Sequence, residues 1–151
     1  MFSVYCRTNM TVSHHTSHKN KTFATLLAFL VGGLGLQRLY LRGPRDPWLW
    51  AHLAALPASA AIAAAWPDAD GFYKLLPIML SGLVGFLEAL VLGLMSDEKW
   101  DARFNPGSGK QSDTHWPLAV VLVASMMMGA GSLIATISRL FDLLYTGGSY
   151  G

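Results

Sequence analysis

The chain has 151 residues, of which 52% are hydrophobic and only 13% are charged, with a formal net charge of +2 and a mean hydropathy of +0.37. The few basic residues are scattered, which argues against a nucleic-acid partner. The length allows one domain, and the single cysteine, Cys6, excludes a disulfide within the chain.

Four apolar stretches make up most of the sequence: Thr22–Leu41, Trp48–Trp66, Leu75–Met95 and Trp116–Ile137. Each is about as long as the ~20 residues that a helix needs to cross a bilayer core. In lipid, every backbone polar group must be satisfied within its own segment, so each stretch is expected to be helical. The sequence therefore predicts an all-α, multi-pass transmembrane bundle of about four helices, built as two hairpins, with both termini on one side of the membrane.

The expected organisation has four parts. A polar N-terminal tail over residues 1–21 precedes a first helical hairpin over 22–66. A second hairpin over 67–145 contains a polar loop at 96–115, and residues 146–151 form a C-terminal tail. No small-residue cleavage site follows the first apolar stretch, so we expect that stretch to remain as a membrane helix and not to be a signal peptide.

The N-terminal tail carries three histidines, His14, His15 and His18, and a second potential start at Met10. A separation of four residues suits two metal ligands on one helix face, as for His14 and His18. No acidic or cysteine residue accompanies them, and Ser, Thr and Asn around them favour a solvated tail. We therefore expect neither a metal site nor a cofactor.

The second half of the first apolar stretch contains three glycines within Gly32–Gly35, followed by Arg38. In a bilayer, glycines allow helices to approach closely. A charged side chain in hydrocarbon is costly, which leaves two interpretations of Arg38. Either its guanidinium reaches the lipid headgroups, with Tyr40 as an interfacial anchor, or it pairs with a carboxylate on a neighbouring helix.

Small residues recur every four positions in the third apolar stretch, at Ser81, Gly85, Ala89 and Gly93. Residues at this spacing share one helix face. The pattern predicts a smooth stripe that another helix can approach closely.

Beside this stripe lies Glu88, the one acidic residue in the core of any apolar stretch. An acidic residue within the membrane is a candidate functional site. Three interpretations are open: a protonated carboxyl that serves only in packing, an ion pair with Arg38 or with a protonated His52, and the handling of protons or ions.

The polar loop at 96–115 begins with a dense segment, Asp97–Phe104, that contains Asp101 and Arg103. We expect this segment to form a short structured cap at the membrane surface, ahead of a flexible Pro- and Gly-containing segment. Basic residues are nearly balanced between the two sides of a four-span arrangement, so the positive-inside rule gives no orientation.

The segment Lys21–Gly43, KTFATLLAFLVGGLGLQRLYLRG, resembles the first half of a TM2 domain. Gln37 and Leu39 stand where that family has His and Phe. An interrupted Asp-Arg-Phe motif lies in the 96–115 loop, away from the position between the first two helices where some TM2 members carry it, so no receptor-like role is transferred. The positions that match the family pattern are Gly33, Gly35, Arg38, Tyr40 and Leu41, and those of the interrupted motif are Asp101, Arg103 and Phe104.

The resemblance extends to bacterial four-span proteins and implies an integral protein of the cell membrane, in bacteria the inner membrane, without a defined biochemical role. The sequence shows no nucleophile–base pair, and the glycines near Gly33 lie inside an apolar stretch rather than in a phosphate-binding loop. We therefore expect no enzyme. The predicted function is an interaction or scaffolding component that binds the lipid bilayer and either other membrane proteins or copies of itself. The alternative is a subunit of a small transporter or ion pathway that uses Glu88.

Overall fold

The computed structural model describes residues 18–149, which form six α-helices and one 3₁₀ turn and contain no strand. Cys6, Met10, His14 and His15 lie outside the described residues. In chain order the elements are α1 (Lys21–Val31), η1 (Gly32–Leu34), α2 (Leu36–Arg42), α3 (Pro47–Ala65), α4 (Gly71–Leu94), α5 (Asp97–Phe104) and α6 (Trp116–Thr146).

Three helices of the described chain, α3, α4 and α6, are long and apolar enough to cross a membrane. The all-helical class expected from the sequence is confirmed, but the count of four spanning helices is not. The first apolar stretch supplies only a shorter apolar segment, Lys21–Leu34.

The expected helix over Thr22–Leu41 is broken by its own glycines. Helix α1 ends at Val31, and Gly35 has a φ of +73°, in the left-handed region that favours glycine. The chain then reverses, and α2 packs back against α1. The ring of Tyr40 meets the ring of Phe23 edge to face, with centroids 5.3 Å apart. Sequence periodicity did not reveal this reversal, because both halves of the stretch are apolar.

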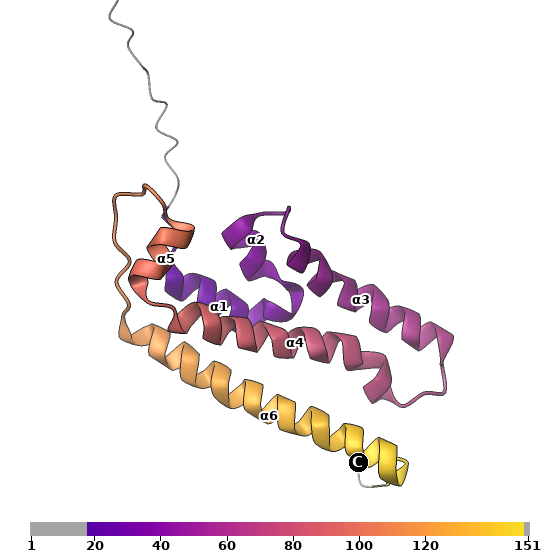
Figure 1. The fold of residues 1–151 in the computed structure, drawn as a ribbon. Coiled ribbons are helices and arrows are strands. Elements are labelled where there is room, and N and C mark those ends of the chain that lie inside the picture. The colour runs from indigo at the N-terminus through magenta and orange to yellow at the C-terminus, as the bar shows by residue number, and fades with distance from the viewer. Residues whose placement is uncertain (1–17, 150–151) are drawn as a thin grey trace, which may run out of the picture.

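Helix α4 is the centre of the bundle (Figure 1). Helix α1 and turn η1 lie against its C-terminal half, where Gly32 meets Gly85 backbone to backbone. Helix α3 begins near the middle of α4, where His52 Nδ1 lies 2.7 Å from Ser81 Oγ, and follows α4 toward its N-terminal end. Together, α1 and α3 cover the length of α4.

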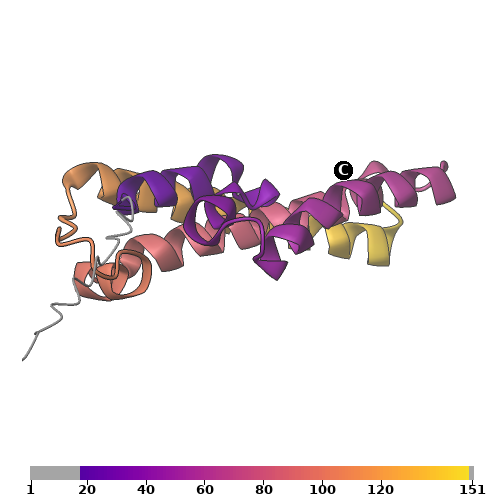
Figure 2. The same ribbon diagram turned by 90° about the horizontal axis from the view of Figure 1, so that it is seen from above.

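Helix α6 runs antiparallel to α4 along its length, and Figure 2 shows the two elongated helices from above. Leu122 lies against Gly93 near one end of α4, and Gly129 lies against Phe86 farther along. At the far end Arg139 Nη2 donates to Asp70 Oδ2 at 3.0 Å. Helix α6 continues to Thr146, beyond the expected end of the apolar stretch at Ile137.

The two ends of the described chain lie at opposite ends of the bundle (Figure 1). The backbone oxygen of Lys19 accepts from Trp100 Nε1 at 3.1 Å, which places the start of α1 beside α5. The C-terminal part of α6 lies beside the turn that precedes α4, through Arg139 and Asp70. The expectation that both termini share one side of the membrane depended on four crossings and is not confirmed, because three helices of the described chain are long and apolar enough to cross.

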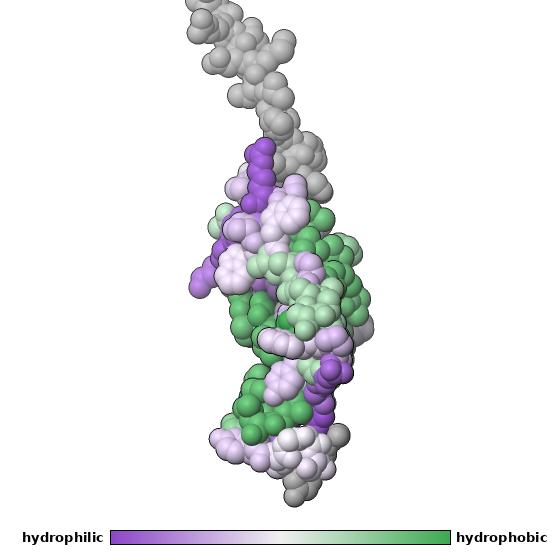
Figure 3. All heavy atoms as spheres, turned by 90° about the vertical axis from the view of Figure 1, so that its right-hand side faces the viewer, coloured by the Kyte–Doolittle hydropathy of each residue, from purple (hydrophilic) through white to green (hydrophobic). Residues whose placement is uncertain are grey.

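The flanks of the bundle are apolar. Figure 3, which views the bundle from its right-hand end in Figure 1, shows patches of hydrophobic residues with hydrophilic residues between them. Large exposed hydrophobic residues occur on each of the three long helices, which is the pattern of a surface that faces lipid. Examples are Leu56 on α3, Leu87 and Val91 on α4, and Met127 and Ile134 on α6.

Candidate functional site

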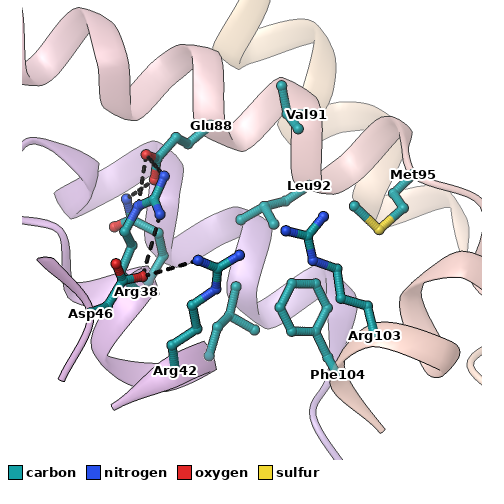
Figure 4. A pocket seen from close by; sticks show the side chains of 11 residues that line it. Arg38, Arg42, Asp46, Glu88, Val91, Leu92, Met95, Arg103 and Phe104 are labelled. Atoms are coloured by element: carbon teal, nitrogen blue, oxygen red, sulfur yellow. Dashed lines mark hydrogen bonds and ion pairs between the residues drawn. The ribbon is translucent and has the colours of Figure 1, made fainter. Parts of the chain in front are cut away.

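Glu88 of α4 lies at the centre of a polar cluster made with α2. Arg38 Nε donates to Glu88 Oε1 at 2.8 Å, and a second guanidinium nitrogen of Arg38 contacts the same oxygen. Gln37 Nε2 donates to Glu88 Oε2 at 2.6 Å. Figure 4 shows the contact between Arg38 and Glu88. Both carboxylate oxygens are thus hydrogen-bonded by adjacent residues of one short helix. Among the interpretations of Glu88, the geometry is that of the ion pair with Arg38.

Arg38 also reaches the start of α3. Its Nη1 donates to Asp46 Oδ2 at 3.3 Å, and its guanidinium carbon lies 5.5 Å from the centre of the Trp48 ring. Asp46 caps α3 by accepting from the Trp48 backbone N–H at 3.1 Å. The side chains of Asp46, Glu88 and Arg38 are only 1%, 13% and 20% exposed. Arg38 therefore joins α2, α3 and α4 through two shielded carboxylates.

His52 of α3 continues the cluster on the other side of Glu88. Ser81 Oγ donates to the backbone oxygen of Gly33 at 2.6 Å, so its single proton is already used. The contact of 2.7 Å between His52 Nδ1 and Ser81 Oγ is then a hydrogen bond donated by Nδ1. This leaves His52 Nε2 3.6 Å from Glu88 Oε1, with no hydrogen-bond partner within residues 18–149. A second proton on the ring turns this contact into an ion pair, whereas a neutral ring sets two acceptors opposite each other.

The stripe of small residues on α4 is buried inside the chain. A Cβ placed on Gly85 would lie 2.5 Å from the carbonyl carbon of Gly32, and one on Gly93 would lie 2.6 Å from Leu122 Cδ2. Ala89 is fully buried, and Ser81 bonds to η1. The stripe is therefore the seam along which α1, η1 and α6 pack on α4, and it presents no free face to another protein.

Helix α5 forms the expected cap beside the start of α1. Trp100 is fully buried, and Asp101 accepts from Ser112 Oγ at 2.6 Å and from Asn105 Nδ2 at 2.9 Å. The hydrogen bond from the Ser112 hydroxyl is the main reason that the pKa of Asp101 lies below its ordinary value, while burial acts in the opposite direction.

A second carboxylate holds the other end of α5. Asp97 accepts from the Thr114 hydroxyl and, at 2.9 Å, from Lys21 Nζ. The Thr114 hydrogen bond is the largest influence on Asp97 and lowers its pKa, burial opposes that shift, and Lys21 lowers the pKa further. Asp97 and Asp101 thus tie the cap to the start of α1 and to the segment that precedes α6.

Arg103 and Phe104 take no part in the Asp101 cluster. They line a cavity of about 110 Å³ between α2, α4 and α5, next to the Arg38–Glu88 pair (Figure 4). Tyr40 lies outside this cavity, and its hydroxyl accepts from the backbone N–H of Asn20 at 3.1 Å. The cavity brings Arg38, Glu88, Arg103 and Phe104 together, whereas the small-residue stripe and Asp101 have other partners.

Two members of the cluster, Gln37 and Asp46, were not singled out from the sequence as site residues. Gln37 is fully buried, and its Oε1 has no hydrogen-bond partner among the described residues. The signal that points to it is its position beside Arg38, directly after the glycine turn. Asp46 can be recognised in the sequence as a helix cap, because it directly precedes Pro47 at the start of an apolar stretch. Its contact with Arg38 depends on the reversal of α2.

Comparison with known proteins gives no relative: no family model, no curated protein and no solved structure matches this chain. Residues 18–149 contain no group of three or more His, Cys, Asp or Glu side chains placed to hold a metal ion. Any functional argument therefore rests on the geometry of the chain itself.

Proposed function

We propose that the chain is an integral membrane protein of the TM2 type that acts as an interaction or scaffolding component, without catalytic activity, in a cell membrane such as the bacterial inner membrane. The observation that carries the proposal is the outward side of α6. This helix packs on the rest of the chain through one side, where Leu118, Ser125 and Thr136 are buried. Its other side is exposed and apolar.

Three small residues share the exposed part of α6. Gly131, Ala135 and Ser138 follow the spacing of a single helix face, and all three are exposed. A Cβ on Gly131 would meet no other atom within 4 Å. In hydrocarbon, such small residues allow a second helix to approach closely. The segment from Trp116 to Ser138 carries no charged side chain, so either lipid or a partner helix can contact it without burying a charge.

The internal charges also support a structural role for this part of the molecule. Arg38 and Glu88 are used in joining α2 and α3 to α4. The small-residue stripe is likewise buried in contacts within the chain. Neither feature is left to recruit a partner, so the proposal assigns the interaction to α6.

The test is a pair of substitutions that add equal bulk to α6. Gly131→Leu is expected to abolish complexes seen in mild detergent, while Ala119→Leu, at an exposed alanine on the opposite flank, leaves them intact. A photo-crosslinker at Ala135 then identifies the partner as another protein or a second copy. Complexes of unchanged size in Gly131→Leu, or no crosslinked product at all, would contradict the proposal.

A proton or ion pathway through Glu88 is the second candidate. It is favoured by two buried acceptors beside this carboxyl group, His52 Nε2 and Gln37 Oε1, which have no hydrogen-bond partner in the part of the chain that the structure describes. The expected result is a proton or cation flux in reconstituted vesicles that Glu88→Gln abolishes and that Glu98→Gln, on the exposed face of α5, does not change. Wild-type vesicles that are no leakier than empty ones would exclude this role.

A further inference from the structure

The cavity between α2, α4 and α5 collects three arginines from two separate helices. Figure 4 shows the side chains of Arg42 and Arg103 directed into it from opposite sides, with Arg38 farther in. Leu92, a wall residue from α4, lies close to them. Because the sequence places Arg103 some sixty residues after the other two arginines, only the fold brings the three guanidinium groups to one place.

The charges at this cavity are not balanced locally. Asp46 and Glu88 are the acidic residues that line it, against three arginines. Arg38 uses both carboxylates, and Arg42 Nη1 reaches Asp46 Oδ2 only at 3.6 Å, with its side chain 43% exposed. Arg103 makes no ion pair with another residue of the described chain, and its guanidinium lies over the ring of its neighbour Phe104, 5.6 Å from the centre.

Two guanidinium groups that point into one small space repel each other, unless an anion lies between them. Their planar donor groups match the oxygens of a phosphate, which can accept two hydrogen bonds from each arginine. The two carboxylates that face the cavity are on its inner side, where Arg38 pairs with both of them, Gln37 donates to Glu88, and Arg42 lies 3.6 Å from Asp46. Three arginines against two carboxylates leave one positive charge, and it is carried by Arg103, which pairs with neither carboxylate. The outer side, between Arg42 and Arg103, is therefore the part with a positive potential.

The position of the cavity indicates which class of phosphate compound can bind there. It lies where the apolar part of α4 ends, close to Met95, and α5 follows with its charged residues. Val91, which lines the cavity, and Leu94 in the next turn are 57% and 72% exposed and form an apolar ridge beside it. A ligand that has a phosphate at the level of α5 and a hydrocarbon chain along this ridge contacts both the arginines and the apolar residues.

We propose that Arg42 and Arg103 bind the phosphate of an anionic phospholipid in this cavity, with its acyl chains along Val91 and Leu94 of α4. This site is independent of the α6 surface assigned above. It also gives a role to Phe104, whose ring packs on Trp100 with centroids 4.6 Å apart and so holds the Arg103 side of the cavity in place.

The experiment is native mass spectrometry of the full chain, released from detergent in the presence of phosphatidylglycerol, phosphatidylcholine or inorganic phosphate. We expect the wild type to retain phosphatidylglycerol about tenfold better than phosphatidylcholine, an effect of the size expected for charge-assisted hydrogen bonds. Arg103→Gln should remove this preference. The control is Arg45→Gln, which removes the same charge from an exposed position that does not line the cavity.

Each arm of the experiment has a defined outcome. Loss of the preference in Arg103→Gln, with retention in Arg45→Gln, supports the site. Equal losses in both variants mean a general effect of surface charge and overturn it. Complete displacement of lipid by millimolar inorganic phosphate assigns the cavity to a free anion and overturns the lipid assignment. Because Arg103 is exposed and makes no ion pair, its variant should unfold at the wild-type temperature, which separates loss of binding from loss of fold.

Discussion

The first and the last apolar stretch are similar in composition, but the first forms two short helices and the last forms one long helix. Helices α1 and α2 fold back on each other around Gly35, and their positions depend on specific polar contacts such as Arg38 with Glu88. Helix α6 runs unbroken from Trp116 to Thr146 and rests on α4 through one apolar side. The difference shows that hydropathy identifies apolar segments, whereas the placement of glycine and of an ion pair accompanies the break of such a segment into two short helices.

The largest expected effect comes from removing the carboxylate that α2 depends on. Glu88→Leu leaves Arg38 partly buried with only Asp46 as a partner, and we expect the free energy of unfolding in detergent to fall by about 3 kcal/mol. Arg38→Met should be costly as well, whereas the double variant should cost clearly less than the sum. The exposed Glu98→Leu is the control, with a change below about 0.5 kcal/mol. Additive single effects would show that the pair does not hold α2 in place.

The close approach of α4 to η1 gives the next largest effect. A methyl group on Gly85 would meet the backbone of Gly32 at 2.5–2.8 Å, and backbone atoms cannot move aside as a side chain can. We expect Gly85→Ala to destabilise by about 2 kcal/mol, in the range of overpacked interiors. Gly82→Ala is the matched control, because a Cβ there meets nothing within 4 Å. If both variants unfold at the same denaturant concentration, the helices are not in the contact described.

The α5 cap should respond to acid while α6 does not. The pKa values of Asp97 and Asp101 are lowered in the folded chain by donors from Thr114 and Ser112. Their contribution to stability is therefore present above the ordinary carboxyl pKa, near about 4, and is lost as the pH falls through the lowered values in the folded state. The protection factors of the α5 amides, which correct hydrogen exchange for its own pH dependence, should fall below about pH 4, and Asp101→Asn should lower them already at neutral pH. Protection that does not change with pH in the wild type would contradict this account of the cap.

The smallest effect is expected on α6. A Cβ on Gly129 would lie 3.1 Å from Phe86 Cβ, so α4 and α6 need to separate there by only a few tenths of an ångström, less than at Gly85. Gly129→Ala should change the free energy of unfolding by less than about 0.5 kcal/mol, because the gain in helix propensity offsets the tighter contact. A loss as large as that of Gly85→Ala would mean that α6 is fitted to α4 as closely as η1 is, and the contrast between the two regions would disappear.

Much of the fold follows from the sequence, and the exceptions have physical causes. The apolar stretches, the cap over Asp97–Phe104 and the helix start at Asp46 were all predictable, because length, polarity and capping residues are local signals. The reversal at Gly35 was not, since glycines in an apolar stretch equally predict close packing of a straight helix. For the same reason, the sequence did not show whether the small-residue stripe packs against another protein or against the rest of the chain.

The candidate site was predictable only in part. Arg38 and Glu88 stand out because charges in apolar stretches are costly and need partners. Pairing between them was one of several interpretations, and the choice required the position of α2. Gln37 and the convergence of Arg42 with Arg103 needed the fold itself, because nothing in the sequence relates α2 to α5.

The most direct test of the central claim, that the first apolar stretch turns back at Gly35 and leaves three described helices able to cross, is the labelling of single cysteines in sealed vesicles by an impermeant reagent. Cys6 precedes α1, and Gln111→Cys in a Cys6→Ser chain places a label in the segment after α5. The reversal at Gly35 predicts that both positions react from the same side, with Ser149→Cys reacting from the other. Labelling of Cys6 and Gln111→Cys from opposite sides would contradict the account and restore a chain with four spans.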